Sequence, residues 1–225
     1  ITSKSYVLNG AGGSKIILNA GKIYRSSWAV YTTGSFVING GTVECNDGSM
    51  AIRVAGSGTI TLNGGTVTSV QVSGGTLNVQ NEDAKITSGI QLDKGAKDVN
   101  ITAGTIDGDI TVAPEVTPDK ITISGGTIED GDAVKDYLEE GKSLDENGNV
   151  VESTVAKIGE VKYTSLQEAL DAAVAGKGNV TVTILENVDL TNVTWKPVTV
   201  SAPHYPVVTV EGNNKTITGL TDMLF

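Results

Sequence analysis

One short motif recurs along the chain: an apolar residue, a small polar residue, a pair of small residues that ends in glycine, and, after one more residue, a second apolar residue. The six copies are IILNAGKIY (16–24), FVINGGTVEC (36–45), ITLNGGTVT (60–68), VQVSGGTLN (70–78), VNITAGTID (99–107) and KITISGGTIE (120–129). Their second small residue is always glycine, at Gly21, Gly41, Gly65, Gly75, Gly104 and Gly126. Most steps between these glycines are roughly 20 to 30 residues, a period typical of solenoids.

The motif has two interpretations, a hairpin tip or a bend within a coil. Asn-Gly between apolar runs is the strongest short hairpin signal. However, the first slot of the pair holds Ala20 in one copy and Ala103 in another, and alanine is poor in the left-handed conformation that a hairpin needs there. We therefore predict a bend with a single glycine at positive φ. The short step of about 10 residues places Gly65 and Gly75 on different sides of one coil, and a weaker copy, ITSGI (86–90), would fill the long gap.

The residues around each bend predict stacked parallel strands. In TITL (59–62), threonine alternates with apolar residues, so one face is buried and the other is solvated. Stacking places like residues above like at about 4.8 Å. We then expect an amide ladder of Asn19, Asn39 and Asn63, and a hydroxyl stack of Thr42, Thr66, Thr105 and Thr127. The predicted fold class is all-β, a right-handed parallel β-helix (β-solenoid) with short capping helices.

Composition limits the core and the partners. Aromatic residues make up 4% and hydrophobic residues 39% of the chain, so valine, isoleucine and leucine must fill the core. The formal net charge of -10, with no basic stripe, excludes nucleic acid as an expected partner. The single cysteine, Cys45, excludes an internal disulfide and a multi-cysteine zinc site, and we expect a small packed residue there. No apolar run is long enough for membrane insertion, and no cofactor is expected.

The chain divides into three predicted segments. Residues 1–131 hold the parallel β-helix repeats. Residues 132–155 form a helical cap and linker, in which Asp132 caps a helix that Gly141 ends. Residues 156–225 are the helix-capped start of a second β-helix module, truncated after its first coil or two, and both ends suggest a piece of a longer protein. The helix of this third segment begins with an S-x-x-E capping box formed by Ser165 and Glu168, and Gly176 ends it. Its apolar face consists of Leu166, Ala169, Leu170 and Ala173.

The blocks ISGGTIEDGDAVKDYLEEGKSLDENGNVV, AKIGEVKYTSLQEALDAA and VEGNNKTITGL resemble modules of large surface proteins of Gram-positive gut bacteria. The resemblance covers most of residues 121–220, and the earlier repeats match as generic solenoid coils. It implies a right-handed parallel β-helix of the broad pectate-lyase-like type, secretion, attachment to the cell wall elsewhere in the polypeptide, and an adhesin-like or glycan-binding role. It implies no active site, because no catalytic motif matches residue by residue.

Two groups of residues are candidates for binding. Tyr24, Arg25, Trp28 and Tyr31 gather in IYRSSWAVY within a chain that has few aromatics. Sugar binders stack rings on aromatic platforms and use arginine for polar contacts. The alternative is that these residues pack a loop against the solenoid wall. In DENGN (145–149), Asp145, Asn147 and Asn149 resemble the start of a calcium loop, with Glu152 as the later acid, whereas the alternative there is a tight turn.

A weaker alternative is catalysis. Asp107 and Asp109 in TIDGDIT are two residues apart on a strand-like stretch, so their carboxylates could face the same way. A polysaccharide lyase or glycoside hydrolase would need them to meet Arg25 or Arg53 within roughly 5–10 Å. The competing interpretation is a turn around Gly108 with two solvated acids. The only histidine, His204, has no evident nucleophile partner and is expected to be an ordinary loop residue, while Trp195 is expected to pack over the second module's helix.

These observations favour a non-catalytic module of a secreted or wall-attached bacterial surface protein, a structural stalk or adhesin-like module with possible partners among host or dietary glycans and surface proteins. The expected location is extracellular or attached to the cell wall. The polysaccharide lyase or glycoside hydrolase is the alternative. Binding to glycans by the isolated chain would separate an adhesive role from that of an inert spacer.

Overall fold

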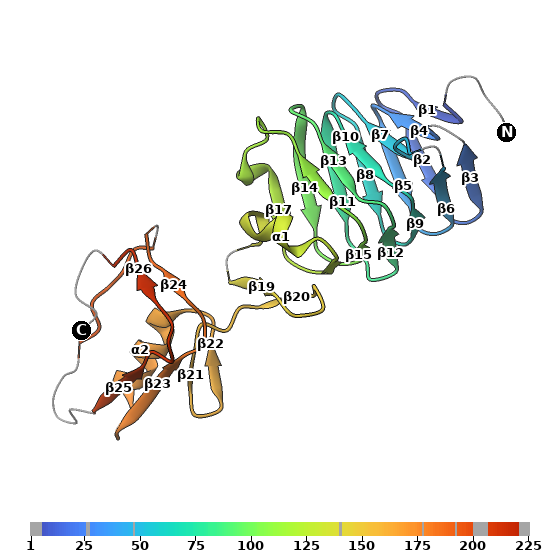
Figure 1. Cartoon of the computed structure of the whole chain (residues 1–225). Helices are drawn as coiled ribbons and strands as arrows, with labels where there is room; N and C mark the ends of the chain where they lie inside the picture. The colour runs from blue at the N-terminus through green and yellow to red at the C-terminus, as the bar shows by residue number, and fades with distance from the viewer. Residues whose placement is uncertain are drawn as a thin grey trace. The chain divides into compact units, whose positions relative to one another are not determined.

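The computed structural model describes residues 6–25, 28–46, 48–139, 141–176, 178–191, 193–199 and 207–220. His204 lies outside these ranges, and so does the side chain of Asp132. The chain forms two compact units, Ile1–Val151 and Glu152–Phe225 (Figure 1). Each unit has a hydrophobic core of its own.

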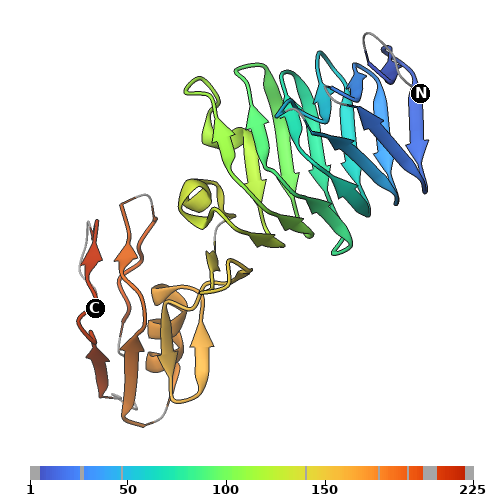
Figure 2. The ribbon, with the colours of Figure 1, turned by 45° about the vertical axis from the view of Figure 1, so that its right-hand side comes forward.

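The first unit is a right-handed parallel β-solenoid with three six-stranded sheets, whose strands follow one another as stacked rungs in Figure 2. Sheet A contains β1 (Leu8–Gly10), β4 (Val30–Thr32), β7 (Ile52–Val54), β10 (Val70–Val72), β13 (Ile90–Leu92) and β16 (Ile110–Val112). Sheet B contains β2 (Lys15–Leu18), β5 (Ser35–Ile38), β8 (Thr59–Leu62), β11 (Gly75–Val79), β14 (Ala96–Ile101) and β17 (Ile121–Ile123). Sheet C contains β3 (Lys22–Arg25), β6 (Thr42–Cys45), β9 (Gly65–Val67), β12 (Ala84–Ile86), β15 (Thr105–Ile106) and β18 (Thr127–Ile128).

Neighbouring strands in these sheets run parallel. The predicted coil is confirmed, and the hairpin interpretation is wrong. All six glycines of the second slot have positive φ, between 75° for Gly65 and 95° for Gly126. Gly65 begins β9 in sheet C and Gly75 begins β11 in sheet B, so they lie on different sides of the coil as predicted.

The prediction that residues 86–90 form a weaker copy of the motif is wrong. Ala84, which pairs with Gly65, occupies the equivalent position in that rung. Gly89 instead lies at the next corner, immediately before β13, with φ of 94°. The rung at β12 therefore turns into sheet C without a glycine at the start of the strand, which is why the motif could not be found there.

Side chains inside the coil form a dry core, and those outside form ladders. Phe36, Ile60 and Leu77 have no exposed surface and follow one another on β5, β8 and β11. The asparagine ladder is confirmed, because Asn39 Nδ2 donates to Asn19 Oδ1 at 2.8 Å and Asn63 Nδ2 donates to Asn39 Oδ1 at 3.0 Å. Such bonds add side-chain pairing to the backbone pairing of parallel rungs.

The predicted threonine stack is interrupted within the solenoid. Thr66 and Thr105 are separated by Lys85, which pairs with both of them. Position 85 faces solvent and therefore accepts a lysine, whose ammonium forms an ion pair with Asp107 at 2.7 Å. Lys22 begins the same column and forms an ion pair with Glu44 at 2.5 Å.

The C-terminal end of the first unit has a shorter helix than predicted. Helix α1 (Gly131–Val134) and the 3₁₀ turn η2 (Lys135–Tyr137) follow β18, and a second 3₁₀ turn, η1 (Pro118–Lys120), precedes β17. Asp130, not Asp132, precedes α1, and the helical segment ends well before Gly141. The reason is the open edge of sheet B: Leu138 bridges Ile123 in parallel, so the chain becomes extended there. Strands β19 (Lys142–Leu144) and β20 (Val150–Glu152) pair next.

The second unit places one helix against a mixed sheet (Figures 1 and 2). The sheet has the order β22-β21-β23-β25, in which β21 runs antiparallel to both neighbours and β23 runs parallel to β25. A separate parallel pair, β24–β26, lies outside this sheet. The bounds are β21 (Ala156–Ile158), β22 (Val161–Tyr163), α2 (Leu166–Ala175), β23 (Val180–Ile184), β24 (Val188–Asp189), β25 (Val208–Glu211) and β26 (Ile217–Thr218).

The predicted serine cap, apolar face and stop glycine of α2 are confirmed, whereas the Glu168 carboxylate accepts the Thr164 hydroxyl at 3.3 Å in place of the Ser165 N–H that a capping box would use. Ser165 Oγ accepts the backbone N–H of Glu168 at 3.2 Å, and Gly176 caps the C-terminus. The four predicted apolar residues are buried, namely Leu166, Ala169, Leu170 and Ala173. Trp195 is 8% exposed and belongs to the same core, beside Lys196, whose N–H donates to Gln167 Oε1 of α2 at 3.1 Å.

Candidate functional site

A single line of outward-facing residues crosses sheet A from rung to rung. The pairing register places Asn9, Tyr31, Arg53, Gln71, Gln91 and Thr111 side by side. Their neighbours in the strands, such as Val30, Ile52 and Val70, point into the core and have no exposed surface. Because side chains alternate between the two faces of a strand, this line lies on the solvent side, and it is called the sheet A column below.

Aromatic rings gather at the first rungs of this column. The Tyr6 and Tyr31 ring centroids are 5.0 Å apart with an interplanar angle of 28°, and the Tyr6 and Trp28 centroids are 6.0 Å apart. The guanidinium carbon of Arg53 lies 5.0 Å from the centroid of the Trp28 ring. These four residues, here called the aromatic cluster, are all half-buried. Each ring is therefore fixed by a neighbour and still presents some surface to solvent.

Both arginines of the chain contact Trp28. Arg53 packs on its ring and donates from Nε to Ser73 Oγ at 2.8 Å, while Ser73 Oγ in turn donates to the Val54 carbonyl at 3.2 Å. Arg25 donates from Nη1 to the backbone carbonyl of Trp28 at 3.2 Å. Stacking and hydrogen bonding together fix the plane of the Arg53 guanidinium.

A polar row continues the column beyond the aromatic cluster. Asp93 follows β13 and accepts two amide groups, from Gln71 Nε2 to Oδ2 at 3.0 Å and from Gln91 Nε2 to Oδ1 at 2.8 Å. The row therefore presents ordered amide and carboxylate groups on the rungs that follow Arg53. Gln71 Oε1 is buried without a hydrogen-bond partner. The groups that can exchange hydrogen bonds with the hydroxyls of a ligand along the sheet are therefore the Gln91 amide and the Asp93 carboxylate.

The structure brings together only part of the binding group predicted from the sequence. Trp28 and Tyr31 meet, and Arg25 reaches Trp28. Tyr24, in contrast, lies on β3 in sheet C, where it is 47% exposed and the Lys22 ammonium nitrogen lies 5.4 Å from its ring centroid. The strand between 22 and 25 ends before Trp28, so nearness in sequence did not put Tyr24 on the same face.

Sequence reasoning missed Tyr6 as a member of the site and assigned Arg53 to a different role. The available signal was the repeat itself: Arg53 lies one winding after Tyr31 and occupies the same column. Tyr6 precedes β1 and carries no motif. Only the fold shows that it stacks on Tyr31.

The two candidate catalytic acids lie at a corner and not on one strand face. Asp107 and Asp109 flank Gly108, whose φ is 76°, between β15 and β16. The interpretation as a turn around Gly108 is confirmed, because its positive φ turns the chain from sheet C into sheet A and neither acid belongs to a strand. The Asp107 carboxylate forms an ion pair with Lys85 at 2.7 Å, and the Gly108 N–H donates to Glu129 Oε2 at 2.8 Å.

Neither arginine lies beside these acids. Arg25 on β3 is four strands away from β15 in sheet C, and Arg53 on β7 is three strands away from β16 in sheet A. At the usual spacing of parallel strands these separations are about 19 Å and about 14 Å. They exceed the roughly 5–10 Å over which paired catalytic groups act in glycosidases.

The residues considered for a calcium loop form a turn that is closed by hydrogen bonds. Asp145 Oδ1 accepts the backbone N–H groups of Asn147 at 2.9 Å and Asn149 at 2.8 Å, and its Oδ2 accepts Asn149 Nδ2 at 2.8 Å. These bonds, those from Asn149 first, lower the pKa of Asp145 from its ordinary value of 3.8. Among the described residues, no group of three or more His, Cys, Asp or Glu side chains is placed to hold a metal ion.

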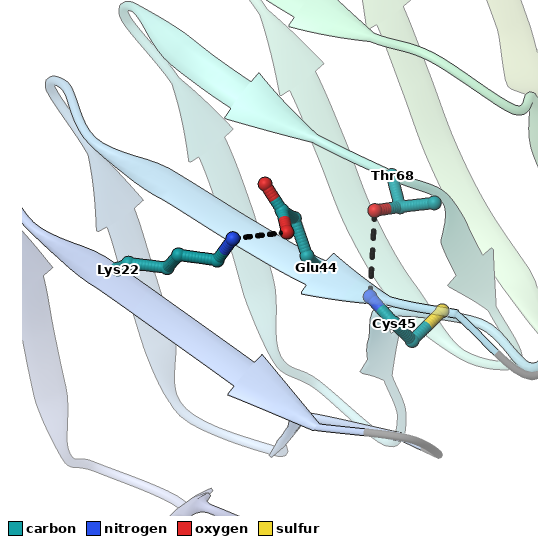
Figure 3. Close-up of polar contacts among 4 residues, drawn as sticks. All are labelled: Lys22, Glu44, Cys45 and Thr68. Atoms are coloured by element: carbon teal, nitrogen blue, oxygen red, sulfur yellow. Dashed lines mark hydrogen bonds and ion pairs between the residues drawn. The ribbon is translucent and has the colours of Figure 1, made fainter.

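Cys45 is part of the solenoid wall, as predicted. It is 6% exposed, and its backbone N–H donates to Thr68 Oγ1 at 3.4 Å (Figure 3). The sulfur contacts the Ser49 carbonyl and lies 4.0 Å from Ser69 Oγ. The same view shows the Lys22–Glu44 ion pair on the outer surface of sheet C. The surroundings of Cys45 are those of a packed side chain.

A hollow of about 390 Å³ lies at the C-terminal cap of the first unit. Its lining includes the acids Glu129, Asp130, Asp145 and Glu146 and one lysine, Lys135. No aromatic ring lines it. The hollow therefore lacks the platform that the aromatic cluster provides, and we regard the sheet A column as the candidate site.

Comparisons with known proteins were negative at each level. No protein family model matches the chain, and searches of curated proteins and of solved structures also return no match. Among the described residues, no helix has the length and apolar character needed to cross a membrane. The functional argument therefore depends on the geometry of the sheet A column.

Proposed function

We propose that the chain is a non-catalytic module of a secreted or wall-attached bacterial surface protein, and that it binds glycans along the sheet A column. The observation that carries the proposal is the aromatic cluster, where two of the chain's six tyrosines meet one of its two tryptophans. Partly exposed rings that are held in place offer apolar faces against which sugar rings pack.

The scaffold supports binding without a large rearrangement. The four central residues of the column, Tyr31, Arg53, Gln71 and Gln91, lie on strands that are hydrogen-bonded to their neighbours in the sheet, with a buried residue on either side along the strand. The column is therefore preorganised, which reduces the entropy lost when a ligand binds. The Gln91 amide and the Asp93 carboxylate supply ordered polar groups two rungs after Arg53. Aromatic rings, a guanidinium and ordered polar groups thus follow one another from rung to rung, which supports the proposed binding of sugars.

The lyase or hydrolase alternative is not proposed. It requires Asp107 and Asp109 to act with an arginine, and both arginines lie at least three strands away. Asp107 is also engaged by Lys85. The stalk role and the adhesive role differ only in whether the column binds a ligand, so one binding experiment separates them.

The test is a glycan array that is probed with the labelled full chain. We expect binding that Trp28→Ala and Tyr31→Ala each abolish, because each variant removes a ring of the aromatic cluster. Tyr24→Ala is the matched control, since it removes an exposed tyrosine from sheet C. Circular dichroism checks that each variant keeps its strands. Absence of binding to every glycan, or equal binding by all variants, would contradict the proposal.

A further inference from the structure

The only two arginines of the chain, Arg25 and Arg53, meet at Trp28. The other basic side chains that carry a fixed charge are lysines, some of which form ion pairs, such as Lys22–Glu44 and Lys85–Asp107. The formal net charge of the chain is -10. Arginine is the cation best suited to stacking on an aromatic ring and to binding carboxylate or sulfate in a fork geometry. Its restriction to this one place is therefore informative.

Neither arginine forms an ion pair in the part of the chain that the structure describes. The Nε–H of Arg53 donates to Ser73 Oγ, and one face of the guanidinium packs on Trp28. Within the described ranges its Nη1 and Nη2 groups have no protein acceptor. A guanidinium carries five N–H donors in one plane, so most of those of Arg53 remain available to a ligand above sheet A.

We propose that the sheet A column binds an anionic saccharide, in which a uronate carboxylate or a sulfate accepts hydrogen bonds from Arg53 while the sugar ring packs against Tyr31 and Trp28. The inference rests on the proposed glycan binding and names its ligand class. The rings favour a saccharide over an acidic peptide because they provide a flat surface for the C–H face of a pyranose.

The charge pattern also limits where the anionic group lies. Asp93, at the end of β13 two rungs from the strand of Arg53, already binds both glutamine amides. Its carboxylate repels a second anion at that end, whereas Arg53 attracts one at the aromatic end. A single acidic sugar next to the aromatic cluster, followed by neutral hydroxyls over the polar row, fits this pattern. A chain with an acid on every sugar is therefore not required.

The experiment compares ligands that differ only in charge. The full chain is titrated with a short β-1,4-linked mannose oligomer whose terminal sugar is a mannuronate and with the all-mannose oligomer of the same length. Binding is followed by calorimetry and by the indole N–H resonances. The chain has two tryptophans, so Trp195→Phe assigns both resonances. A sulfated galactan oligomer and its desulfated form make up the second matched pair, and poly-glutamate is the peptide probe.

We expect at least one acidic oligomer to bind about ten-fold or more tightly than its neutral partner, because hydrogen bonds to charged groups are the stronger class. The Trp28 resonance should shift and the preference should weaken as salt is added. Arg53→Gln should remove the preference, whereas Lys97→Gln should retain it, since Lys97 is an exposed residue of β14 in sheet B. Arg53→Lys should recover only part, because lysine keeps the charge without the planar fork.

Three outcomes would overturn the inference. Equal binding of acidic and neutral oligomers would contradict it and leave the proposed glycan binding intact. Binding of poly-glutamate as tight as that of the acidic oligomers would contradict the saccharide class. Absence of binding by both matched pairs would contradict the anionic ligand, while the glycan array decides the broader proposal separately.

Discussion

The glycine corners allow a test of why successive rungs can stack so closely. Gly21 and Gly41 occupy the same position in consecutive rungs, with φ of 92° and 82°. A Cβ added to Gly21 would meet no atom within 4 Å, whereas a Cβ added to Gly41 would lie 2.5 Å from the Gly21 carbonyl oxygen and 2.9 Å from the Ala20 carbonyl carbon. The two alanine variants therefore share one penalty and differ in a second.

The shared penalty is the left-handed backbone, which costs an L-residue about 1–2 kcal/mol. In Gly41→Ala the new methyl group would also push away the Gly21 carbonyl, which accepts the Thr42 N–H at 2.8 Å. Loss of that bond and burial of its unpaired groups add about 1–3 kcal/mol. We expect Gly21→Ala to lower the free energy of unfolding by about 1–2 kcal/mol and Gly41→Ala by about 2–5 kcal/mol.

The assay is unfolding of the full chain in urea, followed at the Trp28 indole resonance for the first unit and at that of Trp195 for the second. Two reporters are needed because two units need not unfold together. The Trp195 transition serves as an internal control. Equal destabilisation by both variants would refute the reasoning, since it would mean that the positive φ alone, without the close approach of the preceding rung, selects glycine at this corner.

Three further predictions concern individual side chains. Asn39→Ala removes two ladder bonds and should lower the free energy of unfolding of the first unit by about 1–2 kcal/mol in urea, and an unchanged value would remove the ladder from the account of stability. Ser165→Ala removes the cap of α2 and should cost the second unit about 1 kcal/mol, seen as faster amide exchange in α2 only. Hydrogen bonds lower the pKa of folded Asp145 from 3.8, so its contribution to stability is complete above pH 3.8 and is lost as the pH falls through the folded pKa. Asp145→Asn should therefore flatten the acid dependence of the urea unfolding midpoint. An unchanged pH profile would contradict this role of Asp145.

Much of the solenoid is predictable from the sequence because its causes are local. Alternation of apolar and polar residues determines which face of each strand is buried, and an unvarying glycine marks a corner that needs positive φ. Asn19, Asn39 and Asn63 follow from the same repeat. Helix α2 was equally predictable, because Ser165 and Gly176 act on the few residues next to them.

Where the sequence prediction failed, the cause was a competing contact from a distant part of the chain. The cap helix ended early because Leu138 pairs with the open edge at Ile123. No local pattern in the sequence predicts that pairing with the open edge of sheet B prevails over continuation of the helix.

The candidate site, in contrast, was decided by the tertiary structure. Tyr24 and Trp28 are close in sequence and belong to different surfaces, whereas Tyr31 and Arg53 are a full winding apart and adjacent in space. Neighbours across a parallel sheet depend on the number of residues in every intervening corner, and those numbers vary from rung to rung. The repeat by itself determined that side chains would stack in columns, and only the register of the folded coil decided that Tyr31 and Arg53 would share one, beside the ring of Trp28.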